Sequence, residues 1–147
     1  MPLQPQLDEN GNVTPHDHPK ILDDHRVIRR ISKEQHIVTD PKSPTGRRIS
    51  SIAFQASTEG NRGMSVDLEH EIIQAGLDPA EYVTTPLWTG SVVLKVDFLR
   101  AQQFKVGADP LKDNPHHGEV WGTFSDGQKK RLRNASQWLV PIPDVSI

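Results

Sequence analysis

The chain contains no cysteine. Disulfide bonds, zinc–thiolate sites and cysteine nucleophiles are therefore excluded, because each of them needs a thiol group. Long apolar runs are missing as well. The longest run, Val92–Leu94, is far shorter than the roughly 20 residues that cross a bilayer. The first residues lack the apolar core of a signal peptide. These features predict a soluble, cytoplasmic protein without a membrane partner.

Neither sign of charge dominates the sequence. The 17 Lys and Arg residues face 19 Asp and Glu residues, which gives a net charge of −2 at pH 7 with His neutral. A general nucleic-acid binder normally has a basic footprint, so that function class is not expected. Apolar residues make up only 34% of the chain, although a length of 147 residues suffices for one domain with a sizeable core.

The N-terminal residues account for much of the apolar deficit. Residues 1–24 carry four prolines and few apolar side chains, so they bury too little surface to offset the entropy of ordering. We predict a flexible, disordered arm over 1–24 and a single domain over 25–147. In the arm, His16 and His18 could clasp a metal, but two ligands alone make a poor site. We therefore favour solvated histidines and predict no metal site.

Hydrophobic patterns in the remaining sequence predict an α+β fold, with a small, mostly antiparallel sheet and about three helices. Runs of β-branched residues and short alternations indicate strands; these lie at 25–31, 47–54, 90–96 and 117–123. Apolar residues at helical spacing and capping residues indicate helices; these lie at 64–77, 78–82, 98–104 and 126–138.

The segment 64–77 has the clearest helical pattern. Leu68, Ile72 and Ala75 form a stripe at i, i+4 and i+7, which is typical of a helix face that packs on a core. Ser65 or Asp67 is a suitable N-cap, and Gly76 is a suitable residue just after the C-terminus. We therefore expect a helix here, with Ser65 or Asp67 at its start.

Residues 114–122 contain two histidines, a glutamate and a tryptophan in a short run. On a strand, His117, Glu119 and Trp121 would project from one face, because successive side chains alternate. Such a row could bind a metal, act as an acid–base pair, or hold a flat ligand against the indole. The favoured alternative is a solvent-facing sheet on which His117 and Glu119 pair and Trp121 anchors the core.

Arginines on two of the predicted strands form a second candidate site. Arg30 lies on the first strand, and Arg48 precedes Ser51 on the second. Arginine grips phosphate with two parallel hydrogen bonds, so neighbouring strands could form an anion pocket here. Ordinary charged strand edges are the favoured alternative, since exposed arginines are common. The basic stretch 129–133 is interpreted in the same way, as a solvated helix face.

Established catalytic motifs are missing. The sequence has no Gly-x-Ser-x-Gly, no Walker A loop, no Gly-x-Gly-x-x-Gly and no His-Glu-x-x-His. Ser51 can act as a nucleophile only if the fold brings a base to it. No cofactor can be named from these residues.

Four short stretches carry a resemblance to other proteins, and a basic helix that ends in Trp138 follows the last of them. They lie at 29–31, 51–54, 63–67 and 114–122 and read Arg-Arg-Ile, Ser-Ile-Ala-Phe, Gly-Met-Ser-Val-Asp and Asn-Pro-His-His-Gly-Glu-Val-Trp-Gly. In spacing the chain resembles a widespread group of small bacterial proteins without an established activity, so the resemblance implies no function. The order Arg30, Ser51, Glu119 is also similar to that of ADP-ribosyltransferase-like folds, but this is an analogy at the level of the fold.

Two classes of function follow from these residues. The first, slightly favoured, is a small bacterial binding or accessory protein with a protein partner. The second is a small enzyme that acts on a nucleotide or another phosphorylated ligand. In the enzyme, Arg30 or Arg48 would hold the anion, Ser51 would orient it, and His117 and Glu119 would be the acid–base pair. This hypothesis predicts that these side chains line one pocket.

Overall fold

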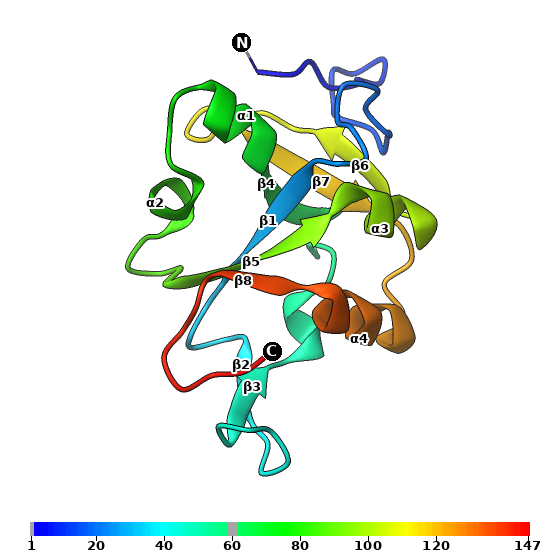
Figure 1. Ribbon diagram of the computed structural model, residues 1–147. Coiled ribbons are helices and arrows are strands. Elements are labelled where there is room, and N and C mark those ends of the chain that lie inside the picture. Colours follow the sequence, from blue (N-terminus) through cyan, green and yellow to red (C-terminus); the bar gives the residue numbers. More distant parts are fainter. Residues whose placement is uncertain (1, 59–61) are drawn as a thin grey trace.

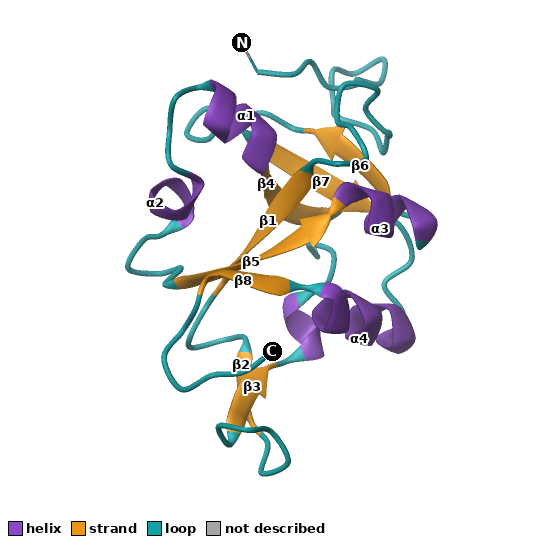
Figure 2. Cartoon of the chain, in the orientation of Figure 1, coloured by secondary structure: helices purple, strands orange, loops and turns teal. Residues whose placement is uncertain are grey.

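A six-stranded antiparallel sheet forms the centre of the molecule (Figures 1 and 2). The structure is a computed structural model that describes residues 2–58 and 62–147. The strands of the large sheet are β1 (Arg26–Ile31), β4 (Met64–Leu68), β5 (Gly90–Lys95), β6 (Lys105–Ala108), β7 (His117–Trp121) and β8 (Gln137–Val140). The other elements are the hairpin strands β2 (Ile37–Thr39) and β3 (Arg47–Ile49), the 3-10 helix η1 (Ser51–Ala53), and the helices α1 (Glu69–Gln74), α2 (Pro79–Val83), α3 (Val96–Ala101) and α4 (Asp126–Ala135). The predicted α+β class is confirmed.

The strand order is β6-β7-β4-β1-β5-β8, and the pairing between β1 and β4 is the shortest in the sheet. Six residue pairs join β1 to β5, but only Val27↔Leu68 and Ile28↔Asp67 join β1 to β4. Beyond Ile28 the two strands separate, while β4 continues alongside β7. The sheet therefore has an opening at its centre, between the C-terminal half of β1 and the N-terminal half of β4.

One face of the sheet carries the main core. Every second residue of the central strands is apolar and buried, for example Val27, Val66, Val92 and Val120. Helices α3 and α4 and the 3-10 helix cover this face. The alternation of apolar and polar residues thus directs one side of each strand into the core.

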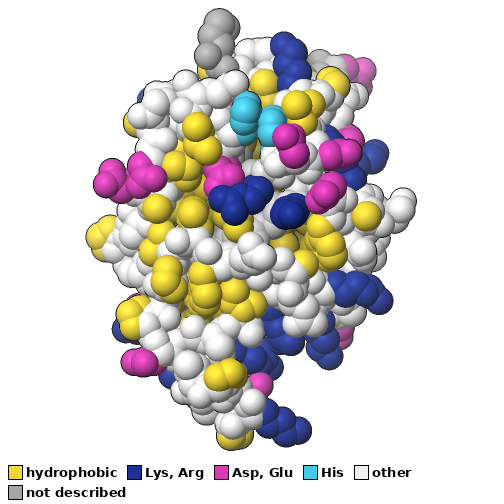
Figure 3. Space-filling view, viewed as in Figure 1, with side chains coloured by type: hydrophobic (Ala, Val, Ile, Leu, Met, Phe, Trp, Pro, Cys, Tyr) yellow, Lys and Arg dark blue, Asp and Glu magenta, His cyan; other side chains and the backbone are white. Residues whose placement is uncertain are grey.

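The opposite face is covered unevenly. Under α1 and α2, Ile28 and Val93 form a small second core with Ile72 and Val83. Farther along the same face, β4 and β7 carry polar side chains, and these form the candidate site described below. On the face drawn in Figure 3, basic, acidic and apolar side chains are interspersed.

The predicted helix over 64–77 is wrong in its first part. Residues 64–68 form β4, and only Glu69–Gln74 are helical. Met64, Val66 and Leu68 are buried in the main core, whereas Ser65 and Asp67 face the other side. The sequence fits both a strand and a helix here, because Leu68 belongs to the alternation of Met64, Val66 and Leu68 and also to the helical stripe. Pairing with β7 decides in favour of the strand.

The chain after α4 also differs from the prediction. The helix expected to reach residue 138 ends at Ala135, where the Ser136 backbone becomes extended. Gln137–Val140 then form β8 along the edge of β5, with Trp138 opposite Val92. No helix in the described part of the chain is long and apolar enough to cross a membrane.

Residues 2–24 contain neither a helix nor a named strand, and only an isolated bridge joins Leu7 to Val13. The end of this arm nevertheless packs on the sheet. His16 and His18, predicted to be solvated, are buried, and Ile21 joins the main core. Hydrogen bonds to the edge strand β6 offset the cost of ordering these residues.

Candidate functional site

A cleft of about 410 Å³ lies where β1 and β4 separate. Its wall combines residues of both strands with α2, the segment that follows α2, and the loop between β6 and β7. The residues that line it are Arg29, Arg30, Ser65, Val66, Asp67, Tyr82, Trp88, Leu111, Asp113, Asn114 and His117. The cleft therefore gathers a hydroxyl, an imidazole and two guanidinium groups around one space.

Ser65 and His117 form a hydrogen-bonded pair in this cleft. The Oγ atom of Ser65 lies 3.0 Å from Nε2 of His117. Both side chains project from the same face of neighbouring antiparallel strands, because Asp67 pairs with His117 and Ser65 pairs with Glu119. His117 is buried, whereas Ser65 is half-buried and lines the cleft. A serine hydroxyl next to a histidine nitrogen is the arrangement that activates a nucleophile.

Asp109 fixes the orientation of the His117 ring. Nδ1 of His117 lies 2.7 Å from the backbone oxygen of Asp109 and 3.4 Å from its carboxylate. A carbonyl oxygen only accepts, so Nδ1 carries the proton and donates it to this oxygen. In the neutral ring Nε2 then has a free lone pair, which accepts the hydroxyl proton of Ser65. The tautomer matches that of a general base directed at Ser65.

A network around Asp67, the residue that pairs with His117, forms another part of the cleft wall. Arg30 donates two hydrogen bonds to this buried carboxylate, of 2.8 and 3.0 Å. Asn114 donates a third, of 2.7 Å, and the hydroxyl of Tyr82 donates to Asn114 Oδ1. Burial raises the pKa of Tyr82, so its hydroxyl remains a donor. Bidentate pairing and a saturated carboxylate hold Arg30 in place at the cleft wall.

Arg29 brings a second guanidinium to the cleft. It donates to the backbone oxygens of Ala53 and Ser65, each at 2.8 Å, and so bridges the opening between β1 and β4. Burial lowers the pKa of Arg29 to about 10, and the nearby Asp67 only partly opposes this effect. Among the described residues, no carboxylate is in ion-pair contact with Arg29. Because buried charges are normally paired, this cation favours an anionic ligand in the cleft.

The positive charge of Arg29 also affects the ionisation of His36. Burial, and then the positive charge of Arg29, lower the pKa of His36 to about 4. His36 is therefore neutral at pH 7, and its ring lies 5.9 Å from that of Trp88. The Trp88 indole, which lines the cleft beside the two arginines, therefore has a neutral imidazole next to it.

Glu119 lies next to the site but does not line the cleft. It is 2% exposed, and Oε1 has no hydrogen-bond partner in the described structure. Burial and the Asp109 carboxylate raise the pKa of Glu119 to about 7, although Arg62 and the Gly63 amide act in the opposite direction. Glu119 is therefore partly protonated at neutral pH, and it lies across from Ser65 on β7.

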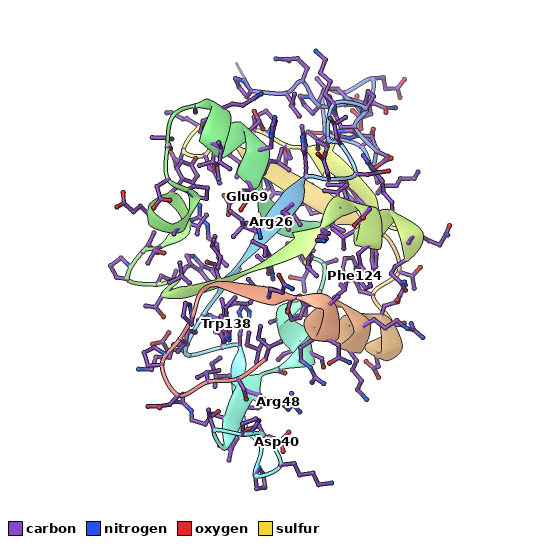
Figure 4. All side chains as sticks on the ribbon, in the orientation of Figure 1. Arg26, Asp40, Arg48, Glu69, Phe124 and Trp138 are labelled. Carbon is purple, nitrogen blue, oxygen red and sulfur yellow. The ribbon has the colours of Figure 1, made fainter. Side chains whose placement is uncertain are left out.

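The other predicted site residues are not gathered in this cleft. Trp121 is buried against the ring of His16, with ring centroids 5.1 Å apart. Ser51 begins the 3-10 helix, which packs against α4 on the side of the main core. Arg48 is on the β2–β3 hairpin, where it pairs with Asp40 at 2.7 Å (Figure 4). Of the predicted site residues, the structure brings Arg30 and His117 together in the cleft, and Glu119 lies next to the cleft without lining it.

A second hollow, of about 460 Å³, lies between the arm and α1. Its walls include His25 and His70, whose rings stack with centroids 3.9 Å apart, and the Arg26–Glu69 pair labelled in Figure 4. It has no serine, threonine or cysteine to act as a nucleophile. Within the described ranges, no group of three or more His, Asp or Glu residues could hold a metal ion.

Sequence reasoning missed two residues on which the site depends. Ser65 was hidden by the expected helix, and Asp109, which contacts His117 but does not line the cleft, was hidden by its place in a loop. The alternation Met64, Val66, Leu68 was the signal that could have identified the strand and its polar side. Comparison with protein-family models, curated proteins and solved structures finds no match for this chain.

Proposed function

We propose that the protein is a small enzyme that cleaves an ester bond in a phosphorylated small molecule, with Ser65 as nucleophile and His117 as general base. The hydrogen bond of 3.0 Å between Ser65 Oγ and His117 Nε2, inside a cleft that contains two arginines, carries the proposal. A substrate phosphate is the recognition group, because Arg29 and Arg30 present donors of the kind that bind phosphate. A nucleotide derivative fits this class.

The reaction follows from the positions of the protons. Nε2 of His117 takes the proton of the Ser65 hydroxyl while Oγ forms a bond to the carbonyl carbon of the ester. The π electrons of the carbonyl move to its oxygen as this bond forms. They return to re-form the double bond when the bond from the carbon to the leaving oxygen breaks, and the leaving oxygen receives the proton from His117. Water repeats both steps on the acyl-serine, which releases the acid and restores Ser65. Asp109 stabilises the imidazolium that forms between the steps.

The predicted acid–base pair of His117 and Glu119 enters this proposal in a changed form. His117 acts directly on Ser65, whereas Glu119 lies across from Ser65 on β7, where the Asp109 charge raises its pKa. Ser65 takes the role that the sequence suggested for Ser51, and Arg29 takes that of Arg48. Trp121 supports the sheet beneath the arm.

A binding or accessory role is the second candidate. Leu87 and Leu111 are exposed beside the cleft, and Trp88 and Leu111 line it, which is suitable for a protein partner at the rim. The proposed setting is a bacterial cytoplasm in both cases. The two candidates differ in turnover, because a binding protein would hold a phosphorylated ligand without changing it.

The test is covalent labelling of the full chain with a fluorophosphonate, which reacts with activated serines, followed by peptide mass spectrometry. We expect the label on Ser65 and its loss in Ser65→Ala and His117→Ala, with Ser43→Ala on the β2–β3 hairpin as the matched control. Phosphorylated small molecules, including nucleotides, should slow the labelling. A label on Ser51, or none on any serine, would contradict the proposal.

A further inference from the structure

The arm residues His16, Asp17 and His18 cover the free edge of the sheet. Strand β6 is one of the two edge strands, so its outward backbone groups need partners from outside the sheet. The His18 amide donates to the Val106 oxygen at 2.8 Å. The Asp17 carboxylate accepts from the Val106 amide at 3.0 Å, and Nε2 of His16 accepts from the Ala108 amide at 3.1 Å. Three consecutive residues thus replace a neighbouring strand.

The ring of His16 is oriented for this role. Its Nδ1 lies 2.7 Å from the backbone oxygen of Thr14, which only accepts, so Nδ1 carries the proton and Nε2 is the acceptor. The ring lies over Gly107, where an added Cβ would come within 2.6 Å of both His16 and Trp121. Only a glycine leaves room for the imidazole at this position.

The hydrogen bond from Ala108 connects the arm to the catalytic histidine. Ala108 precedes Asp109, whose amide donates to the His117 oxygen at 3.0 Å and whose oxygen accepts from His117 Nδ1 at 2.7 Å. The Asp109 backbone is therefore held on one side by His117 and, through the Ala108 amide, on the other side by His16. The Ala108 amide belongs to the Gly107–Ala108 peptide group, and the acceptor oxygen belongs to the Asp109–Pro110 peptide group, two groups farther along the chain. If release of Ala108 lets the Asp109–Pro110 group rotate, Nδ1 of His117 loses its acceptor, and the proton is free to move to Nε2.

Arg100 of α3 fixes the arm in this position. It lies 3.1 Å from the Asp17 carboxylate and 2.7 Å from that of Asp23, and it also donates to the backbone oxygens of His18 and Ile21. Its guanidinium ties both ends of the segment to one helix. The arm is thus held by side-chain contacts at its end, without a strand or helix of its own.

We propose that His16 is a positioning residue for the site: through the Ala108 amide it holds Asp109, and thereby His117, in the orientation that activates Ser65. This inference rests on the proposed function for its catalytic consequence, but the orientation of His117 can be measured independently. It assigns a role to the arm that its composition did not indicate.

The experiment compares His16→Phe with wild type in the full chain. Phenylalanine keeps a ring over Gly107 but has no acceptor for the Ala108 amide. In ¹⁵N NMR spectra of the side chain, His117 should be protonated on Nδ1 in wild type and should shift towards Nε2 in His16→Phe. The rate of Ser65 labelling should fall between about tenfold and about a hundredfold, the loss expected when a catalytic group is displaced by about 1 Å.

Two further variants complete the test. His16→Gln offers a side-chain oxygen to the Ala108 amide and should restore part of the labelling rate, while His70→Ala, an exposed histidine on α1, should change neither readout. If His16→Phe does not fold, His16→Ala replaces it. An unchanged His117 tautomer in the folded variant would overturn the inference. Wild-type Ser65 that does not react would contradict only the proposed function, since the tautomer still reports on His16.

Discussion

Glu119 links the ionisation of one side chain to the stability of the sheet. Its pKa is raised to about 7, first by burial and then by the Asp109 carboxylate. Folding therefore favours the protonated form. The free energy of unfolding is therefore highest, as far as Glu119 is concerned, below the pKa of the unfolded state, near 4.5. It falls as the pH rises towards 7. Above pH 7 the ionised Glu119 costs up to about 3 kcal/mol, because each pKa unit corresponds to about 1.4 kcal/mol.

Glu119→Gln should remove this penalty. The amide has nearly the same shape and does not ionise, so the variant should be more stable than wild type at pH 8 by up to about 3 kcal/mol, and of similar stability at pH 4. Urea unfolding at the two pH values measures the difference. Glu81→Gln on α2, whose parent residue is exposed, is the control and should show no such change. Equal effects of Glu119→Gln at both pH values would contradict the proposed cause.

Arg29 gives a second prediction at the scale of one residue. Inorganic phosphate should raise the melting temperature of wild type, because a ligand that binds only the folded state stabilises it. Arg29→Met should not show this increase, because it lacks the guanidinium that binds only backbone oxygens and has no carboxylate partner among the described residues. Arg48→Met, on the hairpin beside Asp40, should keep it. Loss of the increase in Arg48→Met alone would place the anion site at the hairpin.

The pairing of β4 with β7 is the element that places Ser65 beside His117. Gly118 allows this close approach, because a Cβ at this position would be 2.7 Å from both the Gly107 oxygen and Leu68 Cδ2. Gly118→Ala should therefore lower the free energy of unfolding by roughly 1–3 kcal/mol, the usual cost of overpacking. It should also slow Ser65 labelling, since it moves the strand that carries His117.

Gly127→Ala is the matched control for this change. Gly127 is in α4, and the nearest atom to an added Cβ is Arg131 Nη1 at 3.6 Å. Alanine favours a helix over glycine by roughly 0.5–1 kcal/mol, so this variant should be slightly more stable than wild type. Both substitutions add one methyl group, but we expect the free energy of unfolding to fall in Gly118→Ala and to rise in Gly127→Ala. Urea unfolding measures both changes. A destabilised Gly127→Ala with an unchanged Gly118→Ala would contradict the packing described here.

The elements also show how far the sequence could predict the site. The strands at β1, β5 and β7 follow from their β-branched runs and alternation, and the row of His117, Glu119 and Trp121 was predicted on one face. Strand β4 was not predicted, because Leu68 fits both a helical and a strand pattern and only the pairing with β7 decides between them. The nucleophile is on that strand. The cleft itself depends on the separation of β1 from β4, which no local pattern encodes.

At the scale of the whole molecule, the arm joins parts that are far apart in the sequence. Arg100 contacts Asp17 and Asp23, which are 83 and 77 positions away. His16 is bonded to Ala108, 92 positions away. The proline-rich composition of the arm predicted a flexible, disordered segment and not this docking, because each partner belongs to a distant part of the fold. The arm is held by these contacts to α3 and β6 together with hydrogen bonds among its own residues.

Arg100→Met should loosen the arm while the sheet remains folded. The substitution removes the contacts to Asp17, Asp23 and two backbone oxygens, but it keeps most of the side-chain volume on α3. Trypsin should then cut after Lys20 faster than in wild type, because proteolysis follows local opening, and the Val106 and Ala108 amides should exchange faster with solvent. Arg131→Met, in the exposed part of α4, should leave both rates unchanged. If the amides of β1 and β5 exchanged as fast as those of β6, the substitution would have unfolded the whole sheet, and the arm would be part of its cooperative unit.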